Sequence, residues 1–154
     1  MKNLTCCFTG HRIIEKTDIN ELEKNLSIEI EKLIKRGIIY FNCGGAIGFD
    51  TIAAEAVLRL REIYDNIRLI LVLPCRNQDG RWSEENKERY RKIKENADRI
   101  IYTSDSYTRN CMQIRNKHLV DHSSVCVAYI RRRRGGTAYT VKYAGESGDE
   151  IIVV

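Results

Sequence analysis

The chain has 154 residues, of which 43% are hydrophobic and 31% charged, and its net charge is +5. This balance is typical of a soluble globular protein, and the length predicts a single domain over residues 1–154. No apolar run approaches the roughly 20 residues that span a bilayer, and the amino terminus lacks a signal-peptide pattern. We therefore expect no membrane partner and a cytoplasmic location.

Six cysteines are spread along the chain, and no two of them form a C-x-x-C pair. A zinc or redox motif is therefore unsupported, and we predict neither a metal nor a cofactor. Most of the cysteines fall in or beside apolar runs, where a free thiol packs as a small hydrophobic group. Cys75, which follows the only proline, is predicted to be the most exposed thiol.

Apolar runs alternate with helical periodicity from one end of the chain to the other. Strands are predicted at 4–8, 38–42, 67–73, 99–102, 124–130 and 151–154, and helices at 19–36, 51–63, 84–97, 109–121 and 138–145. Asp18 and Glu21 have capping-box spacing, Gly37 ends the first helix, and Ser83 caps the third. The alternation predicts an α/β fold with a mostly parallel sheet of about six strands and helices on both faces.

Polar or glycine-rich segments follow four of the predicted strands. They are Thr9 to Arg12, Gly44-Gly45, Pro74 to Trp82, and Gly135 to Thr137. In a parallel sheet, ligands bind beyond the carboxyl ends of the strands, where the strand order reverses. These segments are therefore expected at the ligand-binding edge.

The glycine turn from Asn42 to Asp50 joins a predicted strand to an alanine-rich helix. Glycines let the backbone approach a ligand, and the start of a helix offers free N–H groups with a partial positive charge. Gly44 and Gly45 are therefore predicted to cradle a phosphate. A bulky residue at Gly45 should then abolish binding and leave the fold intact. Asp50 either caps the helix or binds a sugar hydroxyl.

The remaining candidates lie in the other segments at this edge. Gly135, Gly136 and Thr137 form a second possible anion cradle. Arg12 can hold a phosphate in a bidentate manner, and His11 can act as a donor or general base. Trp82 either stacks on a base or covers the core edge. The predicted ligand-binding residues are Thr9, Gly10, His11, Arg12, Gly44, Gly45, Asp50, Trp82, Arg115, Asn116, Gly135, Gly136 and Thr137.

The run Arg131 to Arg134 is interpreted as a solvated loop, and a phosphate clamp or a nucleic-acid contact is its functional alternative. It holds four of the chain's 26 basic residues in one stretch. The positive charge permits an anionic partner without requiring one.

Four motifs, in this order, resemble the YpsA/YoqJ-type proteins of the SLOG superfamily (the DUF1273 group). They are Cys6 to Arg12, Gly44 to Asp50 with Ala53-Ala54, Leu73 to Cys75 with Gln78 and Trp82, and Gly135 to Thr137. The resemblance implies a Rossmann-like fold that binds a nucleotide or a derivative such as an ADP-ribose-like ligand, for sensing or sequestration. It also implies a source in Gram-positive bacteria or their phages, and makes a homo-oligomer plausible.

Two more distant resemblances keep alternatives open. LOG phosphoribohydrolases use an arginine, which Arg115 matches, and a P-G-G-x-G-T-x-x-E motif whose glutamate is catalytic. Lys142 stands at the position of that glutamate, so the resemblance favours binding over a nucleotide-processing hydrolase. DprA proteins bind single-stranded DNA on a similar fold, which keeps nucleic-acid binding through Arg131 to Arg134 as the other alternative.

Overall fold

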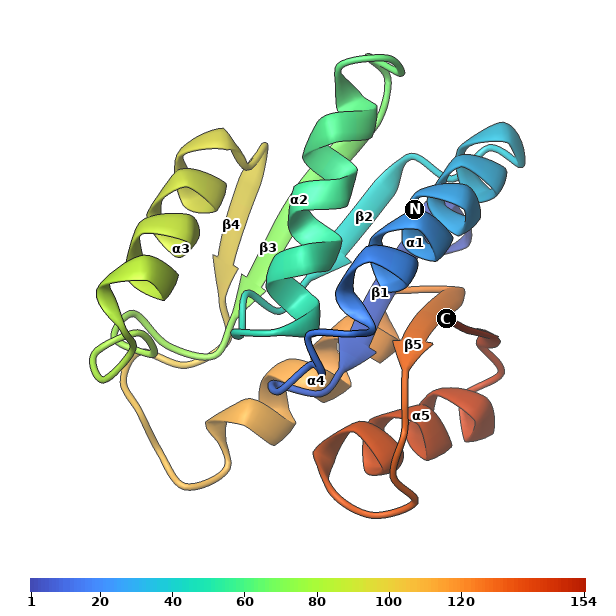
Figure 1. The fold of residues 1–154 in the computed structure, drawn as a ribbon. Helices are drawn as coiled ribbons and strands as arrows, with labels where there is room; N and C mark the ends of the chain where they lie inside the picture. The colour runs from blue at the N-terminus through green and yellow to red at the C-terminus, as the bar shows by residue number, and fades with distance from the viewer.

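A six-stranded sheet lies at the centre of the computed structural model, which describes residues 1–154 (Figure 1). All neighbouring strands are parallel, in the order β4-β3-β2-β1-β5-β6. The strands are β1 (Thr5–Gly10), β2 (Tyr40–Cys43), β3 (Arg68–Leu73), β4 (Arg99–Tyr102), β5 (Val125–Tyr129) and β6 (Glu150–Val153). The predicted α/β fold is confirmed.

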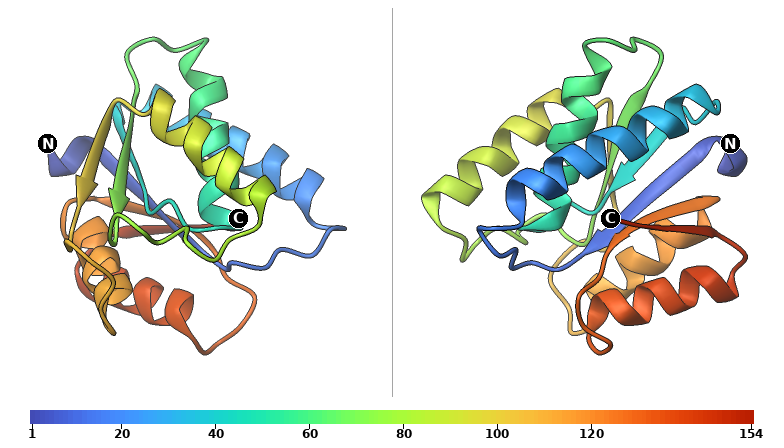
Figure 2. Two further views of the ribbon diagram at one scale, coloured as in Figure 1. Left: turned by 90° about the vertical axis from the view of Figure 1, so that its left-hand side faces the viewer. Right: turned by 45° about the vertical axis from the view of Figure 1, so that its right-hand side comes forward.

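Helices cover both faces of this sheet, which gives three layers (Figure 2). One face carries α1 (Ile19–Lys35), α2 (Phe49–Arg61) and α3 (Glu84–Asn96), and the other carries α4 (Cys111–Asp121) and α5 (Gly136–Glu146). A 3-10 turn, Lys2–Leu4, precedes β1. Every helix falls short of the length and apolarity that crossing a membrane would need.

The core is divided by the sheet because strand side chains alternate between its faces. Cys6 and Phe8 on β1 face the larger cluster under α1, α2 and α3, whereas Cys7 faces a smaller cluster under α4 and α5. All six cysteines are free and buried. The prediction of an exposed Cys75 is wrong, since Cys111 at the start of α4 lies beside it and burial raises the pKa of the Cys75 thiol.

Two of the three predicted helix boundaries have the expected chemistry. The hydroxyl of Ser83 accepts the Asn86 N–H at 3.2 Å, and Gly37 follows α1 with a φ of 103°. The capping box at Asp18 is wrong, because its carboxylate makes no hydrogen bond to the helix. The carboxylate instead accepts the hydroxyl of Tyr129, from the end of β5, at 3.3 Å.

The strand order places a reversal point between β1 and β5. From β1 the chain moves outward through β2, β3 and β4, and then crosses back to place β5 on the other side of β1. The carboxyl ends of the strands point towards the lower edge of Figure 1. The loops after β1 and β5 therefore diverge at this edge, where α/β sheets form their ligand crevices.

Candidate functional site

A cavity of about 300 Å³ lies at this reversal point, between the loop after β1 and the loop after β5. The volume is at the lower end of the range for ligand pockets, roughly 300–1,000 Å³. The sheet topology brings most of the predicted site residues together here. Those on its wall are Thr9, Gly10, His11, Arg12, Asp50, Arg115, Asn116, Gly135, Gly136 and Thr137.

The start of α5 forms one wall of the cavity. Gly135 precedes the helix with a φ of 101°, a conformation that favours glycine, and no side chain caps the helix. Gly136 and Thr137 in the first turn both line the cavity. The first N–H groups of a helix have no partner within it and carry a partial positive charge. This wall therefore offers backbone donors to an anion.

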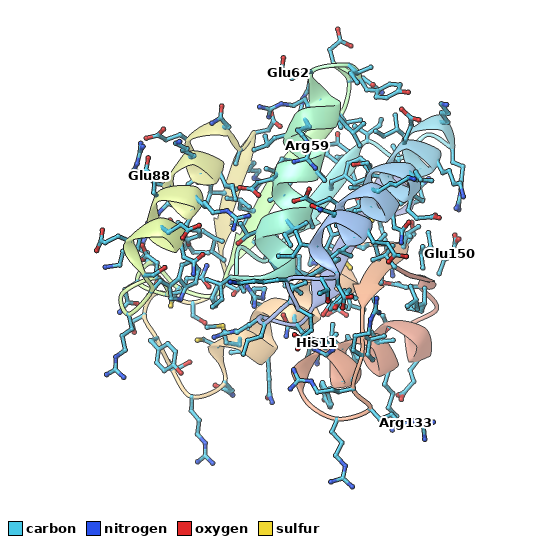
Figure 3. All side chains as sticks on the ribbon, in the orientation of Figure 1. His11, Arg59, Glu62, Glu88, Arg133 and Glu150 are labelled. Carbon is cyan, nitrogen blue, oxygen red and sulfur yellow. The ribbon has the colours of Figure 1, made fainter.

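The arginine run is divided among three environments. Arg132 and Arg134 line the cavity. The Arg131 guanidinium lies 4.1 Å from the centroid of the Tyr129 ring and donates to the carbonyl of Val154 at 3.1 Å. Arg133 lies at the outer edge of the molecule, away from His11 (Figure 3). Sequence reasoning missed the separate roles of Arg132 and Arg134, although their position just before the glycine pair was a usable signal.

The imidazole of His11 is held in one tautomer by the backbone. Its Nε2 accepts the Arg131 N–H at 2.8 Å, so the proton of the neutral ring is on Nδ1. Burial lowers the pKa of His11, and the charges of Arg132 and Arg131 lower it further. The neutral ring therefore has no free lone pair and acts as a donor at Nδ1, which argues against the predicted alternative of a general base.

His11 should make folding less stable in mild acid. The unfolded chain protonates this histidine near pH 6.5, whereas the folded protein resists protonation until a lower pH. The unfolded state then binds more protons, so stability falls as the pH drops below about 6.5. We expect His11→Gln, whose amide oxygen can still accept the Arg131 N–H, to show a shallower loss of urea midpoint between about pH 7 and pH 5. Parallel curves for the two proteins would contradict the assignment.

Asp50 and Arg115 form a buried charged pair beside the cavity, without direct ion-pair contact. Burial raises the pKa of Asp50, and the Arg115 charge and the Ala46 N–H, which donates to Asp50 Oδ2 at 3.2 Å, oppose that rise. The Arg115 guanidinium donates to the carbonyl of Gly44 and, at 2.8 Å, to Asn116 Oδ1. The pair therefore ties the turn before α2 to α4. Asp50 is the one carboxylate on the cavity wall.

Gly44 and Gly45 do not line the cavity, in contrast to the prediction. An added Cβ at Gly44 would lie 2.7 Å from Arg115 Nη1 and 2.8 Å from Asp50 Oδ2. At Gly45, which has a φ of 74°, it would lie 2.5 Å from Leu73 Cδ2. The expectation that a bulky residue at Gly45 leaves the fold intact conflicts with this backbone conformation, which L side chains rarely adopt, and with the close Leu73 side chain.

The start of α2 already has one N–H group in use and carries a carboxylate of its own. The N–H of Phe49 donates to the His11 carbonyl at 3.0 Å, and the Asp50 carboxylate lies in the first turn. A negative charge at this position opposes a second anion. The geometry thus favours the start of α5 over the start of α2 as the place for a phosphate.

Two further positions lie outside the cavity. Trp82 packs edge-on against Tyr90, with ring centroids 5.0 Å apart, and borders a second hollow. Lys142, at the position of the LOG glutamate, is exposed on α5, and its Nζ lies 4.0 Å from Oε1 of Glu146. Residue 142 therefore contributes no acidic group to the cavity wall.

Comparison with known proteins gives sequence relatives and structural neighbours. A UPF0398 protein of Brevibacillus brevis is 28% identical over 152 residues, which cover 92% of this chain and 80% of that protein. The SPbeta prophage-derived protein YoqJ of Bacillus subtilis is 31% identical over 137 residues, which cover 80% of each chain. The expected similarity to proteins of Gram-positive bacteria and their phages is confirmed.

Two solved structures of DNA processing protein A (DprA) share the fold. The Streptococcus pneumoniae protein has a TM-score of 0.70 at 18% identity, and the match covers 99% of this chain and 50% of that one. The Helicobacter pylori protein, described for its single-stranded DNA binding mode, has a TM-score of 0.71 at 20% identity, covering 99% and 65%. The chain thus spans between half and two thirds of these structures.

A family model covers almost the whole chain. Residues 6–150 match the model YpsA, described as the YspA SLOG family. The match includes every segment that forms the cavity, from the end of β1 to the start of α5. Together with the relatives and the fold, it shows that this chain belongs to the YpsA SLOG family.

Proposed function

We propose that the protein binds a nucleotide or nucleotide-derived small molecule in the cavity between β1 and β5, to sense or sequester it. The observation that carries the proposal is a pair of facing donors. The Nδ1–H of His11 and Nη2 of Arg132 lie 3.3 Å apart, and neither group can accept from the other. A phosphate oxygen that accepts from both would satisfy two donors at once.

The charges around the cavity support a phosphate. Four arginines, Arg12, Arg115, Arg132 and Arg134, line the wall against the single carboxylate of Asp50. Guanidinium groups bind phosphate through charge-assisted hydrogen bonds, and the start of α5 adds backbone donors. We place the phosphates at Gly135, Gly136 and Thr137, and assign the buried Asp50 carboxylate to a sugar hydroxyl.

Binding without turnover fits the available groups better than hydrolysis. Neutral His11 has no free lone pair, and Lys142 lies outside the cavity. Asp50, whose pKa is raised by burial, is the one carboxylate that a hydrolase could use here. Incubation with a nucleotide panel, followed by washing, denaturation and mass spectrometry, tests this. We expect an intact ligand to be recovered, and release of a base or a sugar phosphate would favour the hydrolase.

The divided arginine run predicts a specific binding defect. The double variant Arg132→Gln and Arg134→Gln should lower the affinity for AMP by about 100-fold or more, because it removes two charge-assisted hydrogen bonds that are each worth roughly 1.5–3 kcal/mol. Arg133→Gln is the control, because Arg133 does not line the cavity, and we expect less than a twofold change. Calorimetric titration measures both. Losses that depend only on the number of arginines removed would show that net charge, rather than the cavity, attracts the ligand.

Binding of single-stranded DNA is the second candidate, because the H. pylori DprA protein, which shares this fold, is described as binding single-stranded DNA. The different environments of the four arginines count against DNA binding, since the Arg131 guanidinium is held by the Tyr129 ring and the Val154 carbonyl. DNA binding predicts a steep loss of affinity with salt. It also predicts that Arg133→Gln weakens binding, whereas the small-molecule proposal predicts no effect of that substitution.

A further inference from the structure

A second hollow of about 670 Å³ adjoins the cavity. We call it the Trp82 chamber, after the residue that borders it together with Gln78, Arg81 and Tyr107. Arg12 and Met112 line both spaces, and the Arg12 guanidinium lies 3.8 Å from the Met112 sulfur. Two flexible side chains thus form the boundary, so one ligand can contact both spaces.

Gln78 brings an unpartnered acceptor to this chamber. The side chain is buried, with 8% of the residue exposed. Its Nε2 donates to the hydroxyl of Tyr90 at 3.0 Å and to the carbonyl of Gly45 at 3.4 Å, which fixes the orientation of the amide. Its Oε1 has less than 1 Å² of exposed surface and accepts no hydrogen bond from the protein, so a base in the chamber reaches it only when the side chains that cover it move. A buried acceptor without a partner costs about 1–3 kcal/mol, so an N–H donor supplied here would be favourable.

Trp82 supplies the apolar part of the same chamber. Its indole is held edge-on by Tyr90, the residue that also holds the Gln78 amide. An aromatic face of this kind stacks on a base, at roughly 1–3 kcal/mol per base. The chamber therefore combines a stacking surface with an oriented hydrogen-bond acceptor, which are the two features that recognise a heterocyclic base bearing an N–H donor.

We infer that the Trp82 chamber binds the amino-bearing base of the ligand, with Trp82 stacking on the base and Gln78 Oε1 accepting from its amino group. The inference rests on the proposed function, which places the phosphates in the neighbouring cavity. The ligand then lies across Arg12 and Met112, with base and phosphate in separate spaces. A base-free sugar phosphate fills the phosphate cavity alone.

The single tryptophan makes the chamber directly observable, since emission comes from Trp82 without a second indole. ADP-ribose and ribose 5-phosphate are titrated while heat and tryptophan emission are followed. We expect heat from both probes and a change in emission with ADP-ribose only. Heat from ADP-ribose without a change in emission would overturn the inference and leave the proposed function standing. Absence of heat from both probes would overturn the proposed function and the inference with it.

The role of Gln78 is tested by changing the ligand and the protein together. An ADP-ribose analogue with unsubstituted purine lacks the exocyclic amino group, and we expect wild-type protein to bind it roughly tenfold more weakly. Gln78→Leu should remove this preference. Tyr90→Phe is the control, because it removes one partner of Gln78 Nε2 and keeps the Oε1 acceptor, whose orientation the Gly45 carbonyl still fixes. A preference that persists in Gln78→Leu, or is absent from wild-type protein, would contradict the assignment.

Discussion

Gly48→Ala is expected to lower the free energy of unfolding by about 3 kcal/mol or more, enough to unfold a marginal domain. Gly48 has a φ of 80° and a ψ of −123°, outside the left-handed helical region, and a side chain held in such a sparsely populated conformation costs roughly 1–3 kcal/mol. Its added Cβ would also overlap the carbonyl group of Arg12 and lie 2.7 Å from Arg12 Cα. The obstacle is backbone, which cannot rotate away as a side chain can, so the loop after β1 would have to move.

Gly37→Ala measures the conformational cost of a positive φ without the steric overlap. Gly37 has a φ of 103°, and an added Cβ there meets no atom within 4 Å. We therefore expect only the conformational cost, about 1–2 kcal/mol. Urea denaturation followed by circular dichroism gives both values, with unchanged slopes as the check on two-state unfolding. A loss at Gly48 no greater than that at Gly37 would contradict the close approach of the two loops.

Arg115→Leu is expected to destabilise the fold by about 3–5 kcal/mol, the usual cost of leaving a buried charge without its partner. Arg115 holds the Gly44 carbonyl and opposes the rise that burial causes in the Asp50 pKa. Without Arg115 the pKa of Asp50 should rise further. The folded state then binds more protons than the unfolded state, so the variant should gain stability as the pH falls towards that raised pKa.

A double-mutant cycle identifies the cause. Asp50→Asn keeps an oxygen for the Ala46 N–H and removes the buried charge. The variant carrying both Asp50→Asn and Arg115→Leu should therefore be more stable than Arg115→Leu alone at pH 7. Thermal unfolding of the four proteins measures the cycle. Strictly additive losses would show that Arg115 acts through packing alone.

Much of this fold follows from local pattern. Hydrophobic periodicity placed every helix and strand, because each element buries one face or both, and the alternation required a parallel sheet. The exception at Asp18 is instructive: capping-box spacing was present, but the hydroxyl of Tyr129 from a distant strand engages the carboxylate. A tertiary partner at that distance leaves no local signal.

Part of the site was also predictable, because the alternation of strands and helices fixes which loops share one edge of the sheet. The rule for parallel sheets brings His11, Asp50 and Gly136 to one edge whatever their sequence separation. The rule cannot distinguish one glycine turn from another. The N–H of Phe49 is used by the His11 carbonyl, whereas the first turn of α5 lines the cavity. That difference depends on contacts between segments.

Two other features required the packed structure. Within the run of four arginines, Arg131 contacts the Tyr129 ring and the Val154 carbonyl, whereas Arg133 does not. A run of identical residues gives no sign of this difference. The free acceptor of Gln78 is visible only once Tyr90 and Gly45 are seen to hold the amide nitrogen. Sequence indicates which groups are present, and packing determines which of them stay free for a ligand.

The central claim is that the phosphates lie at the start of α5, and backbone amide shifts test it most directly. AMP is titrated into ¹⁵N-labelled protein, and the resonances of the two glycine turns are compared. We predict large shifts for the N–H groups of Gly136 and Thr137, with small shifts for Gly44 and Gly45. Large shifts at Gly44 and Gly45, with Gly136 and Thr137 unmoved, would contradict the account and return the phosphate to the turn before α2.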